Sequence, residues 1–333
     1  MEKPLLSSIK PDRKIKSDHN VFEECFHNNN NNNNNNIIIT SNVYHALPTS
    51  NEIYKNYIQA AYIDNVLTSD ECKKLCNTID NNNDLSFWSA SGRDDDEAKA
   101  FRNADTIEVQ SDIIATIIWN RIKEKFPFID INIKNDEFDE NGIIDTRWER
   151  ELPGIWKAVN LNSDFLFAKY PSGGSFAPHT DGRTIHNFNY RSFYSVIIFL
   201  NSIDDGFGGG TKFYKKEAVE SLERSEKNKQ WTANQNLMTA EVLPKEGRML
   251  IFDQDLVHEG VPPLEFNQKY IIRSDIMYQR SPAVCNSDID IEAYKCFRIA
   301  EDLAEQGNIE ESLPLFRKAF KLSKTLSQMM GQS

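Results

Sequence analysis

The chain has little of what marks membrane, secreted or nucleic-acid-binding proteins. No apolar run reaches the ~20 residues that cross a bilayer, and the polar beginning Met1-Glu2-Lys3-Pro4 does not look like a signal peptide. Lysines and arginines number 38 against 50 aspartates and glutamates, and a net charge of −12 argues against a broad basic face for nucleic acid. The five cysteines show no metal-finger spacing. These shortages favour a cytoplasmic or nuclear protein without membrane or nucleic-acid partners.

A phosphate-binding loop is also missing. The glycines at 206 and 208–210 are followed by no Gly-Lys-Ser/Thr motif and by no helix pattern, so we interpret them as a turn before a strand-like run at 211–214. A chain of 333 residues with 39% apolar content can nevertheless bury a substantial core. The sequence therefore favours one catalytic domain with appendages.

Composition divides the chain into three parts. Residues 1–50 are polar and contain an unbroken asparagine tract at 28–36, which predicts a disordered tail. Residues 51–283 show helix patterns at 69–79 and 111–125, then a series of β-type runs separated by turn residues. This pattern predicts an α+β, mainly β fold, a double-stranded β-helix of jelly-roll or cupin type with flanking helices. The charged stretch at 215–235 is expected to be an inserted loop or short helix over the barrel mouth.

Residues 284–333 change character and predict a helical hairpin. Apolar residues at helical spacing end at Gly307, a good residue for a helix C-terminus, and Asn308 can cap a second helix. The turn at 304–312 resembles that of a single tetratricopeptide-like helix pair, and Pro314 should remove one hydrogen bond from the second helix. Two interpretations remain open: the hairpin packs on the barrel, or residues 288–327 form a docking surface for another protein.

Three residues have the pattern of a metal site. His179 and Asp181 form a His-x-Asp pair, and His258 follows far downstream. Two imidazoles and one carboxylate fill one face of an octahedron around Fe(II) and leave three positions for a co-substrate and O₂. On a strand, residues i and i+2 project to the same side, so His179 and Asp181 can converge on one ion. His258 would then arrive from a second strand, brought there by the apolar run at 248–252.

Two basic residues follow the third of these positions. Lys269 and Arg273 lie eleven and fifteen residues after His258, and in a strand the positions 269, 271, 273 and 275 share one face. A buried lysine or arginine needs an anionic partner, because an unpaired buried charge is costly. A dicarboxylate co-substrate would provide that partner.

Six further segments surround this pattern in a fixed order. They are AYIDNVLTSDEC at 61–72, FRNAD at 101–105, FAKYPSGG at 167–174, RSFYSVIIFLN at 191–201, GGGTKF at 208–213 and VLPKEG at 242–247. Over residues 60–280 the chain thereby resembles the prolyl 4-hydroxylase-like branch of the Fe(II)/2-oxoglutarate dioxygenases.

The resemblance implies an oxidoreductase that uses Fe(II), 2-oxoglutarate, O₂ and ascorbate to hydroxylate a substrate, with release of succinate and CO₂. A prolyl residue of a protein is the leading substrate. His179, Asp181 and His258 become the catalytic iron ligands. Lys269 stands where the family's basic residue pairs with the far carboxylate of 2-oxoglutarate, and Tyr170 where a tyrosine hydrogen-bonds the same molecule. Because the spacing from His258 to Lys269 is one residue longer than expected, Arg273 remains the alternative anchor.

Other functions remain open at this point. The same chemistry could oxidise a small molecule or another residue type. A hydrolytic zinc enzyme could use the same three ligands, although it would have no need for Lys269 and Arg273. A non-catalytic cupin could serve as a scaffold through its C-terminal helices, but the intact ligand set argues against this reading.

Overall fold

The structure, a computed structural model, describes seven stretches of the chain. These are residues 20–26, 45–46, 59–87, 94–125, 130–133, 153–225 and 230–332. The chain divides into two compact units: unit 1 comprises 1–127, 160–182 and 193–276, and unit 2 comprises 128–159, 183–192 and 277–333. Within these stretches, no helix combines the length and the apolar character that crossing a membrane requires. The domain limits expected at 50 and 283 stay predictions.

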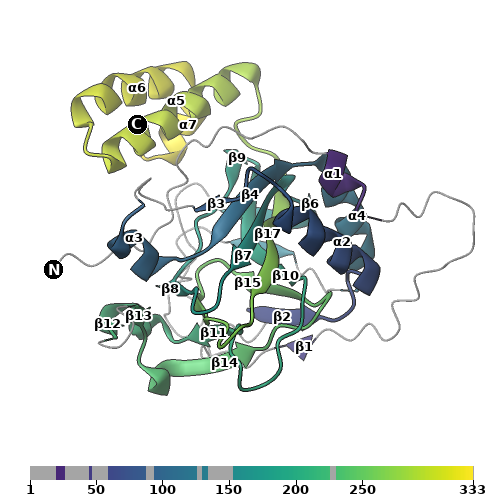
Figure 1. Ribbon diagram of the computed structural model, residues 1–333. Coiled ribbons are helices and arrows are strands. Elements are labelled where there is room, and N and C mark those ends of the chain that lie inside the picture. The colour runs from purple at the N-terminus through teal and green to yellow at the C-terminus, as the bar shows by residue number, and fades with distance from the viewer. Residues whose placement is uncertain are drawn as a thin grey trace, which may run out of the picture. The chain divides into compact units, whose positions relative to one another are not determined.

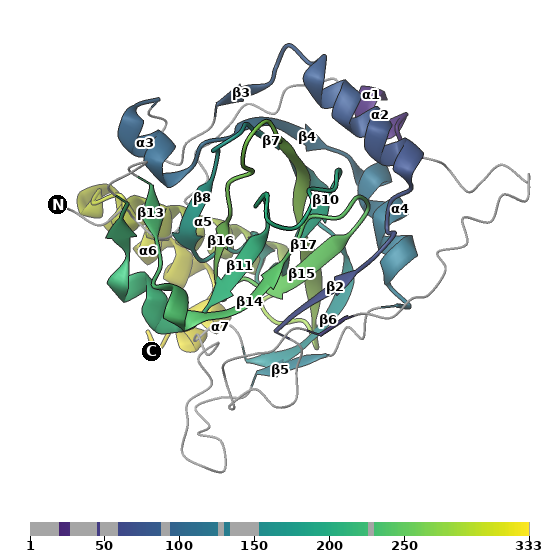
Figure 2. The ribbon, with the colours of Figure 1, turned by 60° about the horizontal axis from the view of Figure 1, so that its bottom comes forward.

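Two antiparallel sheets form the double-stranded β-helix that the sequence predicts (Figure 1). The major sheet has the order β1 (His45–Ala46), β2 (Ala60–Ile63), β15 (Met249–Asp253), β10 (Tyr190–Phe199), β17 (Lys269–Ser281), β7 (Asp164–Tyr170), β4 (Asp105–Gln110) and β3 (Ser86–Phe87), with β5 (Ile131–Ile133), β6 (Gly154–Leu161) and β9 (Ile185–Asn187) attached outside this path. The minor sheet has the order β14 (Met238–Val242), β11 (Thr211–Tyr214), β16 (Val257–Gly260) and β8 (Phe176–His179). Figure 2 looks into the barrel, with β8 and β16 on one side and β10, β15 and β17 on the other.

The core of the barrel lies between the two sheets. Phe213 of the minor sheet packs edge-on against Phe252 of the major sheet, with ring centroids 5.3 Å apart. The same buried cluster contains Ala60, Ala104, Ala168, Tyr170, Phe199, Val242, Leu250 and Ile271. Strand β15, with the sequence MLIFD, is buried at every position, as a central strand covered on both faces should be. Burial of these apolar side chains from both sheets is the main force that closes the barrel.

Two helices confirm the helix patterns of the first half of the catalytic region. Helix α2 spans Ser69–Asp80 and begins with a capping box between Thr68 and Glu71, whereas α4 spans Asp112–Ile122 and its N-cap Ser111 accepts a hydrogen bond from the Ile114 N–H. The two helices are joined by a buried fork in which Arg121 donates to both carboxylate oxygens of Glu71, at 2.7 and 3.0 Å. Helix α3 (Asp96–Phe101) precedes β4.

Part of the expected disordered tail is ordered in the structure. Helix α1 spans Asn20–Glu23, and Phe22 is 1% exposed, with its ring centroid 4.4 Å from that of Phe167. Ser111 donates a hydrogen bond to the Glu23 carboxylate at 2.5 Å. The expectation of disorder therefore does not hold for residues 20–26, because Phe22 completes a hydrophobic contact of the core. The asparagine tract at 28–36 lies outside the described residues.

The charged insertion has secondary structure of its own. Its elements are the 3₁₀ helices η2 (Lys216–Ser221) and η3 (Gln235–Leu237) and the two-stranded hairpin of β12 (Glu223–Arg224) with β13 (Trp231–Thr232). Buried Ala218 and Ala233 anchor it in a cluster with Tyr214 and Val257 of the minor sheet. A role as a lid stays a prediction.

The C-terminal residues of unit 2 form the predicted helical hairpin. Helix α5 spans Asp288–Glu305 and α6 spans Ile309–Leu322, with Gly307 between them at a φ of +83°, a conformation that favours glycine. Asn308 does precede α6, but contrary to expectation its side chain makes no capping hydrogen bond. A third helix, α7 (Lys324–Met329), was not expected from the sequence. A buried cluster that includes Phe188, Tyr294 and Phe297 holds the unit together.

Candidate metal centre

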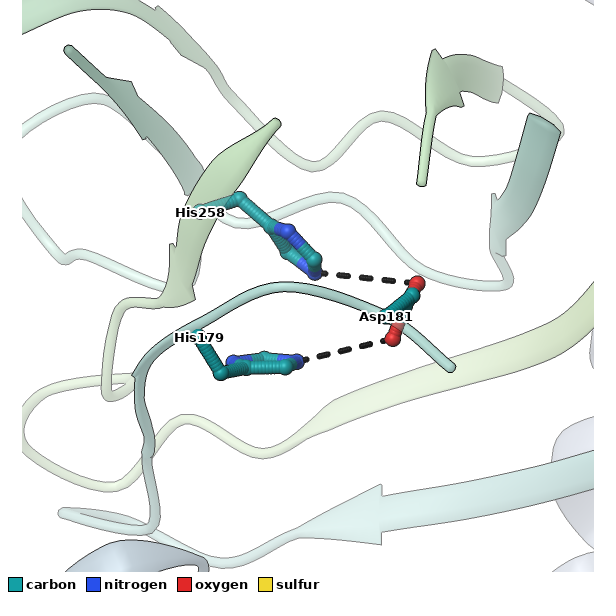
Figure 3. A group of neighbouring side chains, drawn as sticks. All are labelled: His179, Asp181 and His258. Carbon is teal, nitrogen blue, oxygen red and sulfur yellow. Dashed lines mark ion pairs between the residues drawn. The ribbon is translucent and has the colours of Figure 1, made fainter. Parts of the chain in front are cut away.

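The two histidines of the metal pattern face each other across a pair of strands. His179 is the last residue of β8, and the antiparallel pairing of β8 with β16 places His258 directly opposite it. One ligand atom from each of His179, Asp181 and His258 lies within 4.8 Å of the other two. Figure 3 shows the three side chains pointing toward one another. The apolar run before His258 is β15, and a turn separates it from the strand that carries the histidine.

Asp181 reaches this group in a different way from the one expected. Because β8 ends at His179, Asp181 does not lie on the same strand face but in the segment that follows. Its backbone N–H donates to the carbonyl of Gln254 at 3.0 Å. Its carboxylate oxygens lie 3.6 Å from Nε2 of His179 and 3.9 Å from Nε2 of His258. The convergence is thus as predicted, whereas the strand geometry proposed for it is wrong.

Hydrogen bonds leave the two imidazoles ready to act as metal ligands. Nδ1 of His179 lies 2.7 Å from the carbonyl of Ala177, and Nδ1 of His258 lies 3.0 Å from that of Leu256. A carbonyl can only accept, so each Nδ1 carries the proton and each Nε2 keeps its lone pair in the neutral ring. Burial, together with the neighbouring His179, lowers the pKa of His258 to about 4, which keeps that ring neutral near pH 7.

The third ligand is a carboxylate in its charged form. Burial alone would raise the pKa of Asp181, but Arg273 and the two histidines hold it well below its usual range. Two imidazoles and a carboxylate, with no thiolate among them, suit a divalent first-row metal such as Fe(II). The residues therefore fit the ion that the sequence pattern predicts.

Aromatic packing fixes the orientation of both imidazoles. The Phe176 ring stacks on His179 with centroids 3.7 Å apart and an interplanar angle of 20°. On the other side, the Phe252 ring centroid lies 4.5 Å from that of His258. The two imidazoles themselves are 4.3 Å apart. Such packing limits rotation of the rings and so reduces the entropy lost when an ion binds.

Ser195 and Asp275, to which the sequence analysis assigned no role, complete the surroundings of Asp181 together with Arg273. Ser195 on β10 donates to Oδ2 of Asp181 at 2.5 Å, and Nη2 of Arg273 lies 3.5 Å from the same oxygen. Arg273 also lies 3.1 Å from Oδ1 of Asp275, which is fully buried. The shared strand face of 273 and 275 was the one sequence signal for Asp275, whereas nothing local in the sequence singles out Ser195.

Lys269 has different neighbours from Arg273. Its Nζ donates to the carbonyl of Val261 at 3.2 Å and lies 4.4 Å from the centroid of the Tyr170 ring. Within the described part of the chain, no carboxylate lies in salt-bridge distance of Nζ. Burial lowers the pKa of Lys269 to about 7, and Glu259 offsets this only in part. A Cβ on Gly260 would stand 3.5 Å from Nζ, so that glycine leaves space beside the ammonium.

Residues 165–274, about a third of the chain, match the family model described as the 2OG-Fe(II) oxygenase superfamily. Residues 165–274 thus have the features of a 2OG-Fe(II) oxygenase domain. The matched segment runs from β7 into β17. It therefore contains the candidate ligand set and both basic residues.

Several solved structures resemble the oxygenase domain distantly. The viral collagen prolyl hydroxylase vCPH of Paramecium Bursaria Chlorella virus-1 is 16% identical, with a TM-score of 0.38 over 66% of this chain and 96% of that one. A Trichoplax adhaerens prolyl hydroxylase, in complex with a fragment of hypoxia inducible factor, is 14% identical, with a TM-score of 0.41 over 67% and 83%. HygX of Streptomyces hygroscopicus, with nickel, 2-oxoglutarate and hygromycin B bound, is 11% identical, with a TM-score of 0.37 over 67% and 84%. No curated protein sequence matches the chain. Similarities at this level do not indicate a substrate.

Proposed function

We propose that this chain is an Fe(II)- and 2-oxoglutarate-dependent dioxygenase that hydroxylates a prolyl residue of a protein and releases succinate and CO₂. One observation carries the proposal. Two imidazoles and a carboxylate converge in a buried site of the oxygenase domain, and the same barrel holds a buried lysine that has no carboxylate partner among the described residues. Iron held by His179, Asp181 and His258 would supply the oxidising chemistry with O₂. The rest of the reaction depends on how the protein binds and orients the two organic reactants.

Lys269 is the residue we assign to the far carboxylate of 2-oxoglutarate. Lys269 is 2% exposed and, among the described residues, its ammonium donates to a backbone carbonyl alone, so a dicarboxylate would supply the negative charge that burial demands. Tyr170 pairs with Lys269 in the β7–β17 register and lies beneath the ammonium, where its hydroxyl could share the same carboxylate. Gly260 provides the space next to them. We assign Arg273 no such role, because it already faces two carboxylates.

The prolyl substrate rests on the resemblance of residues 60–280 to the prolyl 4-hydroxylase-like branch. A prolyl residue fixes φ and disfavours helix at the residue before it, so the target would lie extended across the barrel mouth. The net charge of −12 favours a neutral or basic protein partner, for which residues 288–327 would offer a docking surface. We further propose that ascorbate supports turnover. All five cysteines are free thiols, which is compatible with a cytoplasmic or nuclear location.

The test is substrate discovery with matched inactive enzyme. The full chain is incubated with dialysed cell extract, Fe(II) and ascorbate, with or without 2-oxoglutarate, and peptides are searched by mass spectrometry for a gain of one oxygen. His258→Ala in the same extract is the control. Hydroxyproline that depends on 2-oxoglutarate and is absent with His258→Ala would support the proposal. If succinate formation instead depends on a free amino acid or another small molecule, the prolyl substrate is refuted. If no succinate forms under any condition, the dioxygenase function is refuted.

A further inference from the structure

The surroundings of Asp181 suggest a function for the second basic residue of β17. We infer that Arg273 and Asp275 form a buried charged pair that positions Asp181 as a metal ligand, so that only one of its carboxylate oxygens is offered to the ion. The inference rests on the proposed function, because it concerns the same site. It makes Arg273 a positioning residue and separates its task from that of Lys269.

Asp181 needs such support because the strand ends before it. Strand β8 stops at His179, so the ladder hydrogen bonds that hold His179 opposite His258 do not extend to Asp181. The backbone of Asp181 has one described anchor, the hydrogen bond from its N–H to the carbonyl of Gln254. A ligand oxygen must be held within a few tenths of an ångström to be useful, and a single backbone bond does not fix the rotation of a side chain.

The Ser195 hydroxyl and the Arg273 guanidinium both meet the same oxygen of Asp181, Oδ2. Oδ2 accepts from the Ser195 hydroxyl at 2.5 Å and faces Nη2 of Arg273 at 3.5 Å, and that nitrogen also lies 3.5 Å from Oγ of Ser195. Oδ1 lies 3.6 Å from Nε2 of His179. Two donors therefore occupy Oδ2, which also lies 3.9 Å from Nε2 of His258, whereas Oδ1 faces Nε2 of His179 and meets neither donor. A carboxylate held in this way binds through one oxygen and keeps neighbouring positions of the ion open.

Asp275 holds Arg273 in place and balances its charge. Its carboxylate is fully buried, lies 3.1 Å from Nη2 of Arg273 and accepts a hydrogen bond from the Gln254 side chain, also at 3.1 Å. Gln254 thus touches both ends of the arrangement, since its carbonyl accepts the Asp181 N–H and its amide contacts Asp275. Arg273 and Asp275 stand two residues apart on β17, so they share one face of the strand. Without the guanidinium, two buried carboxylates would face each other across the space it leaves.

The experiment measures metal binding apart from turnover. Co(II) serves as the probe, because its visible spectrum reports the number and type of ligands and it does not need O₂ to be excluded. The variants are Arg273→Met, which removes the guanidinium, and Arg273→Met/Asp275→Asn, which also removes the charge left behind. We expect both to bind Co(II) roughly 10–100-fold more weakly, the usual effect of losing a residue that orients a ligand, and to show an altered spectrum. The double variant should regain thermal stability relative to the single one.

Controls separate positioning from general destabilisation. Arg121→Met/Glu71→Gln removes another buried ion pair of unit 1, and it should lower the melting temperature yet leave the Co(II) dissociation constant within about twofold. If Arg273→Met/Asp275→Asn binds Co(II) with the affinity and spectrum of the wild type, the pair has only a structural role and the inference is wrong. It is equally wrong if Arg273→Met keeps its Co(II) affinity but loses 2-oxoglutarate binding. A wild-type chain that binds no Co(II) or Fe(II) would refute the proposed function together with this inference.

Discussion

Replacing Lys269 by methionine should stabilise the protein and at the same time abolish its response to 2-oxoglutarate. Burial lowers the pKa of the Lys269 ammonium from 10.5 to about 7. The folded protein therefore releases a proton that the unfolded chain keeps until the pH approaches 10.5. Because the unfolded state binds more protons between these two values, stability should rise with pH across that window. A methionine of similar length has no charge to bury and should be free of this dependence.

The magnitude follows from the two pKa values. At about 1.4 kcal/mol for each pH unit, burial of this amine costs about 4 kcal/mol at pH 7 and about 2 kcal/mol at pH 9. We therefore expect the free energy of unfolding of Lys269→Met to exceed that of the wild type by up to about 4 kcal/mol at pH 7, and by about half as much at pH 9. The gain should be largest when no co-substrate is present, since a bound dicarboxylate would neutralise the ammonium of the wild type.

Urea unfolding at the two pH values, with and without 2-oxoglutarate and Co(II), provides the assay. The wild type should gain stability with 2-oxoglutarate, whereas the variant should gain none. Lys169→Met is the matched control, because Lys169 lies on β7 of the same sheet but pairs with Asp80 near the surface at 2.7 Å. It should lose no more than about 1 kcal/mol. A Lys269→Met protein less stable than the wild type at pH 7, or one that 2-oxoglutarate still stabilises, would refute the assignment of an ammonium buried to receive an anion.

Three further predictions follow from the site and the helices. His258→Ala should lose stoichiometric iron binding and succinate formation while its circular dichroism spectrum stays native. Asp181→Glu should lose nearly as much iron binding and activity, because an added methylene displaces the ligand oxygen. Iron retained by both variants would contradict the assigned ligands. Because the pKa of Lys269 is about 7 before binding, binding of 2-oxoglutarate at pH 8 should be accompanied by uptake of nearly one proton on Lys269, and at pH 6 by uptake of far less. Calorimetry in two buffers of different ionisation enthalpy can measure this uptake. Arg121→Met should destabilise the fold by about 3–5 kcal/mol in denaturant titrations, since it leaves Glu71 buried and unpaired, and a loss below 1 kcal/mol would mean that the pair is dispensable.

Much of the fold could be predicted from the sequence because its signals are local. The helices at 69–80 and 112–122 begin at Thr68 and Ser111, whose side chains cap the first turn, and a cap followed by a periodic apolar pattern needs no distant residue to be recognised. Gly307 marked the end of α5 for the same reason. Helix α1 and its contact through Phe22 escaped this reasoning, because four residues within a polar tail carry no periodicity.

The sequence by itself determined which residues could bind a metal and which basic groups could meet an anion. His179, Asp181, His258, Lys269 and Tyr170 were all named as candidates from residue type, spacing and resemblance. Only the tertiary structure decided which charged and polar groups lie beside each of them. Strand β8 ends at His179, so Asp181 depends on Gln254 and on side chains from β10 and β17, strands of the other sheet. Among the described residues, Lys269 has no carboxylate within salt-bridge distance, whereas Arg273 lies between two carboxylates. Only the folded chain shows this distinction, because spacing along one strand shows which side chains share a face but not which charges lie opposite them.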